Sequence, residues 1–301
     1  MKEEVRCFQA SPLILQIADV LLRPGMLYDA HNHLQFEELT PHLDQVARDL
    51  AAIDLGGAVV NGTHPTDWDA VVALAERFPW VTPSFGIHPW DVAVRPDDWQ
   101  LRFIHYLETN PHAHVGEIGV DRWILEPGRD QDPMLEGVPP APIEEQMEVC
   151  AWQLRWAADH NRAATLHCVR AWGPLLEVLK STPIPERGFL LHAYGGSPEQ
   201  VAEFAKLGAY FSYNTSLIDP RKTRQRKAFQ VVPADRLLVE TDAPAFAPPH
   251  PRFTLPDQKP GSWCNHPANL AMAYADLAQL RGNDPSSLEE NVAKNFVRLF
   301  A

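Results

Sequence analysis

The sequence predicts an α/β protein whose eight strands and intervening helices close into a (β/α)8 barrel, the TIM barrel. Three observations predict this fold. Short apolar runs recur eight times, stretches of helical periodicity lie between most of them, and polar side chains follow several runs directly. Apolar strands that alternate with helices are typical of a parallel sheet covered by helices. The segment from Met26 to Ala301 is close to the usual barrel length of about 250 residues.

The expected strands are short and apolar, and many are bounded by Gly, Pro or charged residues. They occupy residues 26–30, 56–61, 80–85, 113–117, 162–167, 188–192, 208–212 and 236–242.

Helical periodicity is clearest in three of the intervening segments. The shared faces are Leu43, Val46, Ala47 and Leu50; Val71, Leu74, Ala75 and Phe78; and Met147, Cys150, Ala151, Leu154 and Ala158. Helix starts are expected at Thr40-Pro41, at Asp67 and at Ser197-Pro198, because these residues suit a cap or the first helical position.

Side chains that can bind a metal ion stand at the ends of five of the expected strands. His31 and His33 flank Asn32, and residues two apart in a strand point to the same face. The six candidates together are His31, His33, Glu117, His167, His192 and Asp242. Because the carboxyl ends of barrel strands share one face, where active sites are built, we expect these side chains to converge.

Imidazoles combined with carboxylates suit Zn, Mn or Mg. Two such ions can hold an attacking water and clamp both oxygens of a displacement at phosphorus. A pair of ions needs a bridging carboxylate, and Glu117 is placed to supply it.

An ordered set of motifs resembles the TatD-type metal-dependent deoxyribonucleases of the amidohydrolase superfamily. The motifs span residues 28–34, 86–89, 115–121, 166–170, 192–196, 238–244 and 291–296. The resemblance runs from about residue 26 to the end, and it implies a metal-dependent hydrolase of phosphodiester bonds.

The resemblance also implies roles for individual residues. His31, His33 and Asp242 would serve one metal, and His167 and His192 the other. Asp242 would also take the proton of the attacking water, as a carboxylate general base, and Glu117 would complete the catalytic pair. His88 and Arg170 are candidates for binding the substrate phosphate, although Arg170 could equally form a surface salt bridge.

Several positions depart from the family pattern. They are Asn32, Gln35, Val120, Tyr194 and Ala245. The stretches 122–142 and 244–262 are long and rich in Pro, and they are expected near the mouth of the barrel. Substrate choice is therefore less constrained by the resemblance than the metal site is.

The expected substrate is DNA with single-stranded or frayed ends, because a rigid duplex is too wide to reach ligands at the base of a loop-lined mouth. Unstacked bases could lie on Trp90, Trp172 or Tyr194, or these rings could be packing residues. Two alternatives stay open. One is an amidohydrolase-superfamily esterase or amidase, although these often bridge the metals with a lysine. The other is a non-catalytic metal-binding relative, although all six ligands are retained.

The composition sets limits on partners and location. A net charge of −13 gives no chain-wide attraction to nucleic acid. A local basic run is expected to be a solvated helix face that could track a phosphate backbone; it comprises Arg221, Lys222, Arg224, Arg226 and Lys227. His64 is expected in a second shell or a loop, and His160, His250 and His266 in loops or solvent.

The remaining expectations concern compartment and domain boundaries. Cys7, Cys150, Cys168 and Cys264 show no paired spacing and are expected to be reduced thiols of a cytoplasmic protein. No apolar run is long enough to cross a membrane, and no obligate protein partner is evident. Residues 1–25 are expected to be an N-terminal extension, with the barrel domain at 26–301.

Overall fold

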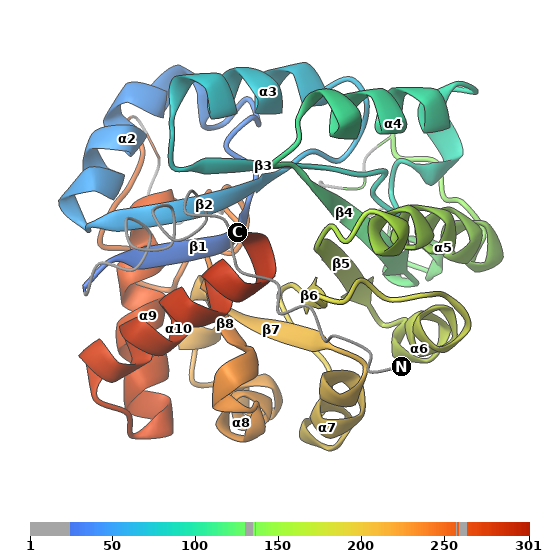
Figure 1. Ribbon diagram of the computed structural model, residues 1–301. Coiled ribbons are helices and arrows are strands. Elements are labelled where there is room, and N and C mark those ends of the chain that lie inside the picture. The colour runs from blue at the N-terminus through green and yellow to red at the C-terminus, as the bar shows by residue number, and fades with distance from the viewer. Residues whose placement is uncertain (1–24, 130–134, 136, 257, 259–263) are drawn as a thin grey trace, which may run out of the picture.

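The computed structural model describes residues 25–129, 135, 137–256, 258 and 264–301. Its eight strands form one parallel sheet in the order β1 to β8, as Figure 1 shows. They are β1 Leu27–Asn32, β2 Leu55–Asn61, β3 Val81–Phe85, β4 His114–Asp121, β5 Ala164–Val169, β6 Phe189–Leu191, β7 Ala209–Asn214 and β8 Leu237–Glu240. Each expected run overlaps one strand, so the strand prediction is confirmed.

The sheet closes on itself where β8 returns to β1. The amide of Asp242 donates to the carbonyl of His31 at 2.9 Å, and that of His33 donates to Ala243 at 2.8 Å. At the same junction between β8 and β1, the amide of Thr241 donates to Asp29 Oδ1 at 2.9 Å. The predicted (β/α)8 barrel is therefore confirmed, and its closure sets Asp242 beside His31.

Helices cover the outside of the barrel (Figure 1). They are α2 Leu43–Ala52, α3 Trp68–Arg77, α4 Trp99–Thr109, α5 Ile143–Asp159, α6 Trp172–Ser181, α7 Pro198–Lys206, α8 Thr223–Val231, α9 Leu270–Arg281 and α10 Pro285–Phe300. Short 3-10 turns interrupt the loops: η1 Thr40–His42, η2 Val92–Val94, η3 Trp123–Leu125, η6 Thr215–Ile218, η7 Ala234–Arg236 and η8 Pro267–Asn269. The three predicted helical faces fall on α2, α3 and α5.

The expected caps behave differently from one another. Pro198 opens α7, and the amide of Ser197 donates to Gln200 Oε1 at 3.3 Å, which is half of a capping box. Asp67 precedes α3, but its carboxylate accepts from the amide of Thr63 rather than from the helix. Thr40 and Pro41 open η1, which runs directly into α2, so a helical segment starts where it was expected although Thr40 does not cap α2.

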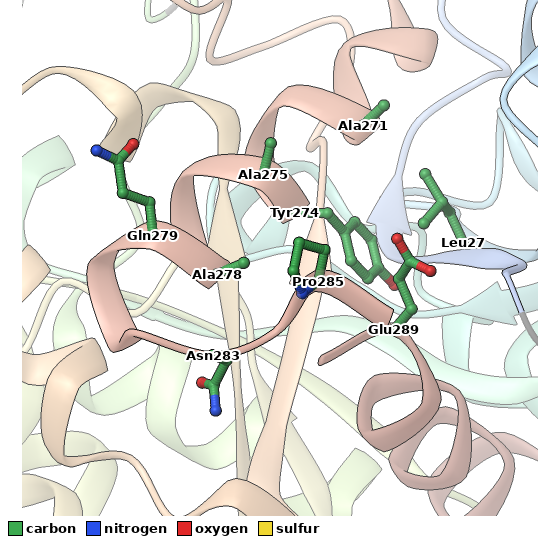
Figure 2. Close-up of a pocket in the computed structure, with 9 residues that line it drawn as sticks. All are labelled: Leu27, Ala271, Tyr274, Ala275, Ala278, Gln279, Asn283, Pro285 and Glu289. Carbon is green, nitrogen blue, oxygen red and sulfur yellow. The ribbon is translucent and has the colours of Figure 1, made fainter. Parts of the chain in front are cut away.

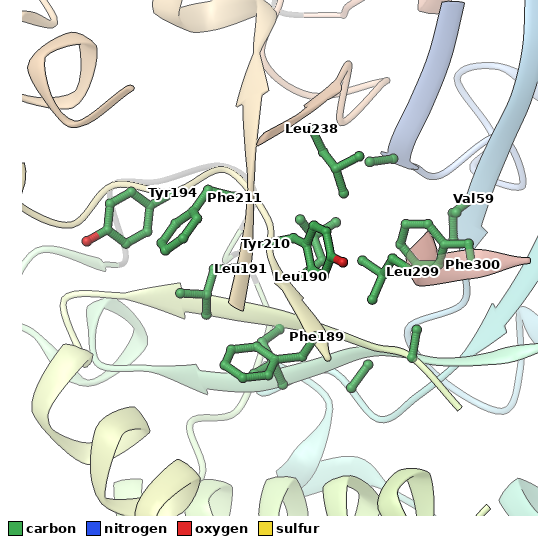
Figure 3. Packing of buried hydrophobic residues seen from close by; sticks show 14 of the residues in the cluster. Val59, Phe189, Leu190, Leu191, Tyr194, Tyr210, Phe211, Leu238, Leu299 and Phe300 are labelled. Carbon is green, nitrogen blue, oxygen red and sulfur yellow. The ribbon is translucent and has the colours of Figure 1, made fainter. Parts of the chain in front are cut away.

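The core fills the space inside the strands and between strands and helices. Figure 3 shows Phe189 and Leu191 of β6 beside Tyr210 and Phe211 of β7, all at most 1% exposed. Successive strand residues point to opposite faces, so a parallel sheet covered by helices buries both sets. The rigid strands that result are the platform on which the polar residues stand.

A cavity of about 330 Å³ lies between the start of β1 and the helices α9 and α10 (Figure 2). Leu27, the first residue of β1, lines it together with Tyr274 of α9 and Glu289 of α10. It therefore opens near the amino ends of the strands.

Some expectations fall partly or wholly outside the described residues. Residues 1–24, which include Cys7, are not described, and the stretches 122–142 and 244–262 are described in part. Within the described ranges, no helix is both long and apolar enough to cross a membrane.

Candidate metal centre

All six predicted ligands meet at the carboxyl ends of the strands. Their side chains are between 0 and 11% exposed. Glu117 and His167 lie within β4 and β5, whereas His33, His192 and Asp242 lie just beyond strand ends. Glu117 was expected to end its strand, but β4 continues to Asp121.

One group of ligand atoms includes the imidazoles of His31 and His33, at the end of β1. His31 Nε2 and His33 Nε2 are 3.0 Å apart. Asp242 Oδ1 lies 3.4 Å from each of these nitrogens. Glu117 Oε2 lies 3.4 Å from His31 Nε2 and 3.2 Å from His33 Nε2.

A second group surrounds the other oxygen of Glu117. Its Oε1 atom lies 2.7 Å from His192 Nε2 and 2.9 Å from His167 Nδ1, and these two nitrogens are 3.2 Å apart. His88 Nε2 lies 3.4 Å from the same oxygen. The two oxygens of one carboxylate are thus divided between two groups of imidazoles.

The spacing of the first group fits a divalent cation. Around an ion with bonds of about 2.0–2.1 Å, neighbouring ligands are about 3.4 Å apart in a tetrahedron and about 3.0 Å apart in an octahedron. The measured separations of 3.0–3.4 Å fall in this range. Buried imidazoles and carboxylates at such distances supply the donors that Zn, Mn or Mg takes.

Hydrogen bonds on the far side of two imidazoles fix their tautomers. His33 Nδ1 donates to the carbonyl of Asn61 at 2.8 Å, and His167 Nε2 donates to Asp121 Oδ2 at 3.1 Å. Because a carbonyl and a carboxylate only accept, each neutral ring keeps its lone pair on the nitrogen that faces Glu117. Metal-ligating histidines are oriented in this way by an outer partner.

Carboxylates of the site stabilise the charged forms of His33 and His167, and the surrounding histidines stabilise the charged form of Glu117. Burial alone lowers the pKa of His33, but hydrogen bonds that the protonated ring donates to Asp242 and Glu117 outweigh it and raise the pKa to about 9. The same balance, with Asp121 and Glu117 as partners, raises the pKa of His167 to about 10. Burial raises the pKa of Glu117, yet the surrounding histidines hold it well below its usual value. The carboxylates are therefore ionised, and protons and cations compete for the same imidazole lone pairs.

The strand ends carry backbone conformations that are unusual for residues other than glycine. Asp242 has φ +51° and Ala193, which follows His192, has φ +44°. Residues in this region persist when their surroundings hold them there. The buried Glu240 does so for Ala193, whose amide donates to its Oε1 atom at 2.6 Å. Glu240 therefore helps to aim His192.

Sequence reasoning assigned no role to Asp121 or Glu240, although both stand inside the quoted motifs. Asp121 accepts hydrogen bonds from His167, from Trp90 Nε1 at 2.6 Å and from the amide of Trp123 at 2.7 Å. A signal was present in each case, namely a carboxylate near a strand end. Its partner was visible only once the strands were side by side.

The two predicted phosphate-binding residues are placed differently. His88 is buried at the edge of the second group, and the amide of Trp90 donates to its Nδ1 atom at 3.2 Å. Arg170 is 57% exposed, forms an ion pair with Glu126, and lies over the ring of Trp123 at 4.5 Å. Within the described ranges Arg170 contacts none of the six candidate ligands.

Of the two alternatives for Tyr194 the structure supports the packing residue, and His266 lies in a loop, as expected, but is not exposed to solvent. Tyr194 is fully buried and packs against Phe211 at 4.9 Å, so no base can stack on it. His266 is also fully buried and caps η8 through a hydrogen bond from the amide of Ala268 at 3.1 Å. Trp90 remains half-buried beside His167, with ring centroids 6.3 Å apart.

A TIM barrel with buried imidazoles and carboxylates at its strand ends defines the class of metal-dependent hydrolases. The chain matches the family described as "TatD related DNase" over residues 28–301. It therefore belongs to that family, and the resemblance seen in the motifs is confirmed.

Individual relatives agree with the family match. The chain is 27% identical over 277 residues to a "3'-5' ssDNA/RNA exonuclease TatD" of Citrobacter koseri, covering 91% of this chain and 98% of that one. It is 26% identical over 284 residues to a "Putative deoxyribonuclease TATDN3" of Mus musculus, covering 91% and 88%. A crystal structure of YJJV, a TatD homologue of Escherichia coli, superposes with a TM-score of 0.77 at 25% identity, covering 91% and 97%.

Proposed function

We propose that this chain is a two-metal phosphodiesterase that removes nucleotides from single-stranded or frayed DNA ends. The proposal is carried by one observation, the division of Glu117 between two groups of imidazoles. Its Oε2 atom faces His31 and His33, and its Oε1 atom faces His167 and His192. A carboxylate in this position can bridge two ions.

In this proposal His31, His33 and Asp242 hold one ion, His167 and His192 hold the other, and Glu117 joins them. The ions are Mg, Mn or Zn, and when bound they lower the pKa of the attacking water and stabilise charge on the phosphate. Asp121 and Asn61 orient the imidazoles from behind.

Asp242 acts as the general base. Its Oδ1 atom lies 3.4 Å from the Nε2 atoms of His31 and His33, and its Oδ2 atom lies 3.9 Å from His192 Nδ1. Oδ2 is therefore the atom left to accept the proton of the attacking water.

His88 serves the substrate. Because its Nδ1 atom accepts from the amide of Trp90, the neutral ring carries its proton on Nε2. Burial lowers the pKa of His88 and keeps the ring neutral. Nε2–H is then a donor aimed at the centre of the site, which suits a phosphate oxygen. Arg170 can reach a phosphate only if its contacts with Glu126 and Trp123 are exchanged.

A substrate panel tests the proposal. Metal-stripped protein is supplied in turn with Mg, Mn and Zn, and offered end-labelled single-stranded DNA, duplex DNA, bis(p-nitrophenyl) phosphate and p-nitrophenyl carboxylic esters. We expect metal-dependent cleavage of the phosphodiesters, with single strands degraded faster than duplex. Glu117→Gln serves as the control for a contaminating nuclease and should be inactive.

Turnover of carboxylic esters or amides while every phosphodiester stays intact would replace the nuclease with an esterase or amidase. Metal binding without turnover of any substrate would favour the non-catalytic alternative.

A further inference from the structure

Phe246 is an exposed aromatic residue in a conformation that bulky residues avoid. It lies four residues after Asp242, its φ is +56°, and it is 40% exposed. A positive φ is uncommon for any residue with a side chain and an outlier for a bulky one. Such strain persists only where neighbouring groups impose it, and it clusters at functional sites.

Two side chains impose this conformation. Thr215 Oγ1 donates to the carbonyl of Phe246 at 2.5 Å, and Asn265 Nδ2 donates to Thr215 Oγ1 at 2.9 Å. The amide of Asn265 also donates to the carbonyl of Pro244 at 2.7 Å. The segment after β8 is thus tied to the residue that follows β7, and the backbone of Phe246 is held in place.

A half-buried cation lies over this ring. Lys222 Nζ is 5.7 Å from the ring centroid of Phe246, near the outer limit of about 6 Å for a cation–π contact. It also donates to Ser216 Oγ at 2.7 Å. Burial lowers the pKa of Lys222, and Asp219 partly offsets this.

Lys222 has no paired carboxylate among the described residues. Asp219 is held by Arg221, whose Nη2 atom is 2.6 Å from its Oδ2 atom. A buried charge is stabilised by a counter-charge, and Lys222 has a hydroxyl instead. This position therefore favours an anion supplied from outside.

We propose that Phe246, Lys222 and Ser216 form a nucleotide subsite next to the metal centre, with a base stacked on Phe246 and a backbone phosphate held by Lys222 and Ser216. The inference rests on the proposed function and adds to it a site for a nucleotide next to the one that is cleaved. Four residues span at most about 14 Å, so the Cα atom of Phe246 lies within about that distance of the Cα atom of Asp242.

The chemistry of a single strand matches both halves of the subsite. Unpaired bases stack on aromatic side chains whatever their sequence, and their phosphates need cations. The chain as a whole carries a net charge of −13, so binding near the metal centre depends on local cations such as Lys222.

The test compares variants on a long and a short substrate. Phe246→Ala and Lys222→Gln remove the two contacts, and Phe246→Trp and Lys222→Arg restore them. Leu101→Ala on α4, at a residue 72% exposed, and Lys206→Gln at an exposed position in the last turn of α7 are the matched controls. Each protein is assayed for KM and kcat on a single-stranded oligodeoxynucleotide and on bis(p-nitrophenyl) phosphate. Binding of a fluorescein-labelled oligonucleotide is followed separately by anisotropy in chelator.

We expect Phe246→Ala to weaken oligonucleotide binding and raise its KM by about 5- to 150-fold, the range that base stacking gives. Turnover of bis(p-nitrophenyl) phosphate should stay within about two-fold of wild type, because this substrate does not reach the subsite. Lys222→Gln should flatten the slope of log affinity against log salt by about 0.7, the value of one single-strand phosphate contact. The restoring variants and the controls should match wild type.

Three results overturn the subsite. Wild-type and variant proteins that bind and cleave the oligonucleotide equally well would exclude it. Equal losses on the long and short substrates would show a structural role for Phe246 and Lys222. A wild-type protein that neither binds nor cleaves the oligonucleotide would overturn both the subsite and the proposed function. Binding that depends on Phe246 and Lys222 without any cleavage would instead support the subsite and reject the nuclease.

Discussion

Two residues, Asp242 and His33, lie 3.4 Å apart in the same group of atoms but are assigned different roles. His33 is assigned as a metal ligand, and its hydrogen bond to the carbonyl of Asn61 fixes the nitrogen that carries the lone pair. Asp242 is assigned both as a ligand through Oδ1 and as the general base through Oδ2. Variants of these residues should therefore fail in different ways.

Asp242→Asn should keep the fold, because the side chains are nearly isosteric, and lower kcat on the order of 100-fold or more at saturating metal. His33→Ala should lower metal occupancy first and regain activity as the metal concentration rises. Steady-state kinetics across a metal titration distinguishes the two. An unchanged kcat for Asp242→Asn would reject its role as the base.

Asp121 supports the site from behind His167. Asp121→Asn should weaken metal binding about 10- to 100-fold, as loss of an outer carboxylate partner does. Isothermal titration of metal-stripped protein measures this. Trp90→Phe is the matched control, because it removes a hydrogen bond to the same oxygen and leaves the carboxylate in place. Equal affinities for Asp121→Asn and wild type would show that Asp121 does not orient a ligand.

At the residue scale, the sequence predicted what depends on residue type and missed what depends on packing. The six candidate ligands could be named because imidazoles and carboxylates follow apolar runs. The sequence left the burial of Tyr194 and His266 undecided, because it is determined by helices and loops distant in the chain. Asp121 was passed over because its role needs β4 to run beyond Glu117.

Among the elements, β4 and β5 lie close together at a glycine. Gly119 has φ +146°, and a Cβ atom there would lie 2.1 Å from the carbonyl oxygen of His167. The pairing of Gly119 with His167 helps to place Glu117 and Asp121 of β4 against the His167 ring.

Gly119→Ala should therefore lower the free energy of unfolding by at least about 3 kcal/mol, through overpacking and backbone strain together. It should also reduce metal binding, because the two strands must separate. Gly128→Ala is the control: Gly128 also has a positive φ, +95°, but nothing lies within 4 Å of an added Cβ. Urea unfolding of the metal-free proteins compares them, and equal losses would show that the contact at Gly119 is unimportant.

The strands were predictable because a parallel sheet buries both faces and leaves continuous apolar runs. The starts of the helices were less predictable from the sequence. Thr40 carries a capping side chain, yet a 3-10 turn intervenes before α2. Cap propensity is a local signal, and the local chain path decides whether it is used.

Across the whole molecule, His114 fastens the last helix to the barrel. Its Nε2 atom donates to the carbonyl of Phe300 at 2.8 Å, and its Nδ1 atom accepts from the amide of Ala163 at 3.2 Å. Both bonds require the neutral ring. Burial lowers the pKa of His114 to about 3, against 6.5 for an exposed histidine.

Between these two pKa values the unfolded chain binds a proton that the folded chain does not, so stability falls as the pH falls from 6.5 towards 3. Near pH 5 the loss from His114 alone is about 2 kcal/mol. His114→Gln should be less stable at neutral pH but lose about 2 kcal/mol less than wild type between about pH 7 and pH 5. The urea midpoints of both proteins, measured across this pH range in the presence of chelator, report the difference in stability. If the midpoints of wild type and His114→Gln fall in parallel as the pH is lowered, the role of His114 is contradicted.

Barrel topology followed from the number and order of the apolar runs, together with their spacing. The convergence of six side chains followed from the topology alone, since parallel strands end on one face. The contact between Phe246 and Lys222 could not be predicted from the topology. It joins the loops after β7 and β8, and it depends on a positive φ at Phe246 that residue type does not predict.

The number of metal ions bound at Glu117 tests the account most directly. Metal-stripped wild-type protein titrated with Mn or Zn, with elemental analysis of the product, should bind two ions per chain and gain thermal stability by mass action. The Glu117→Gln variant should no longer bind the two ions together. Binding of one ion or fewer per chain at saturating metal would contradict the central claim that this carboxylate joins two metal sites.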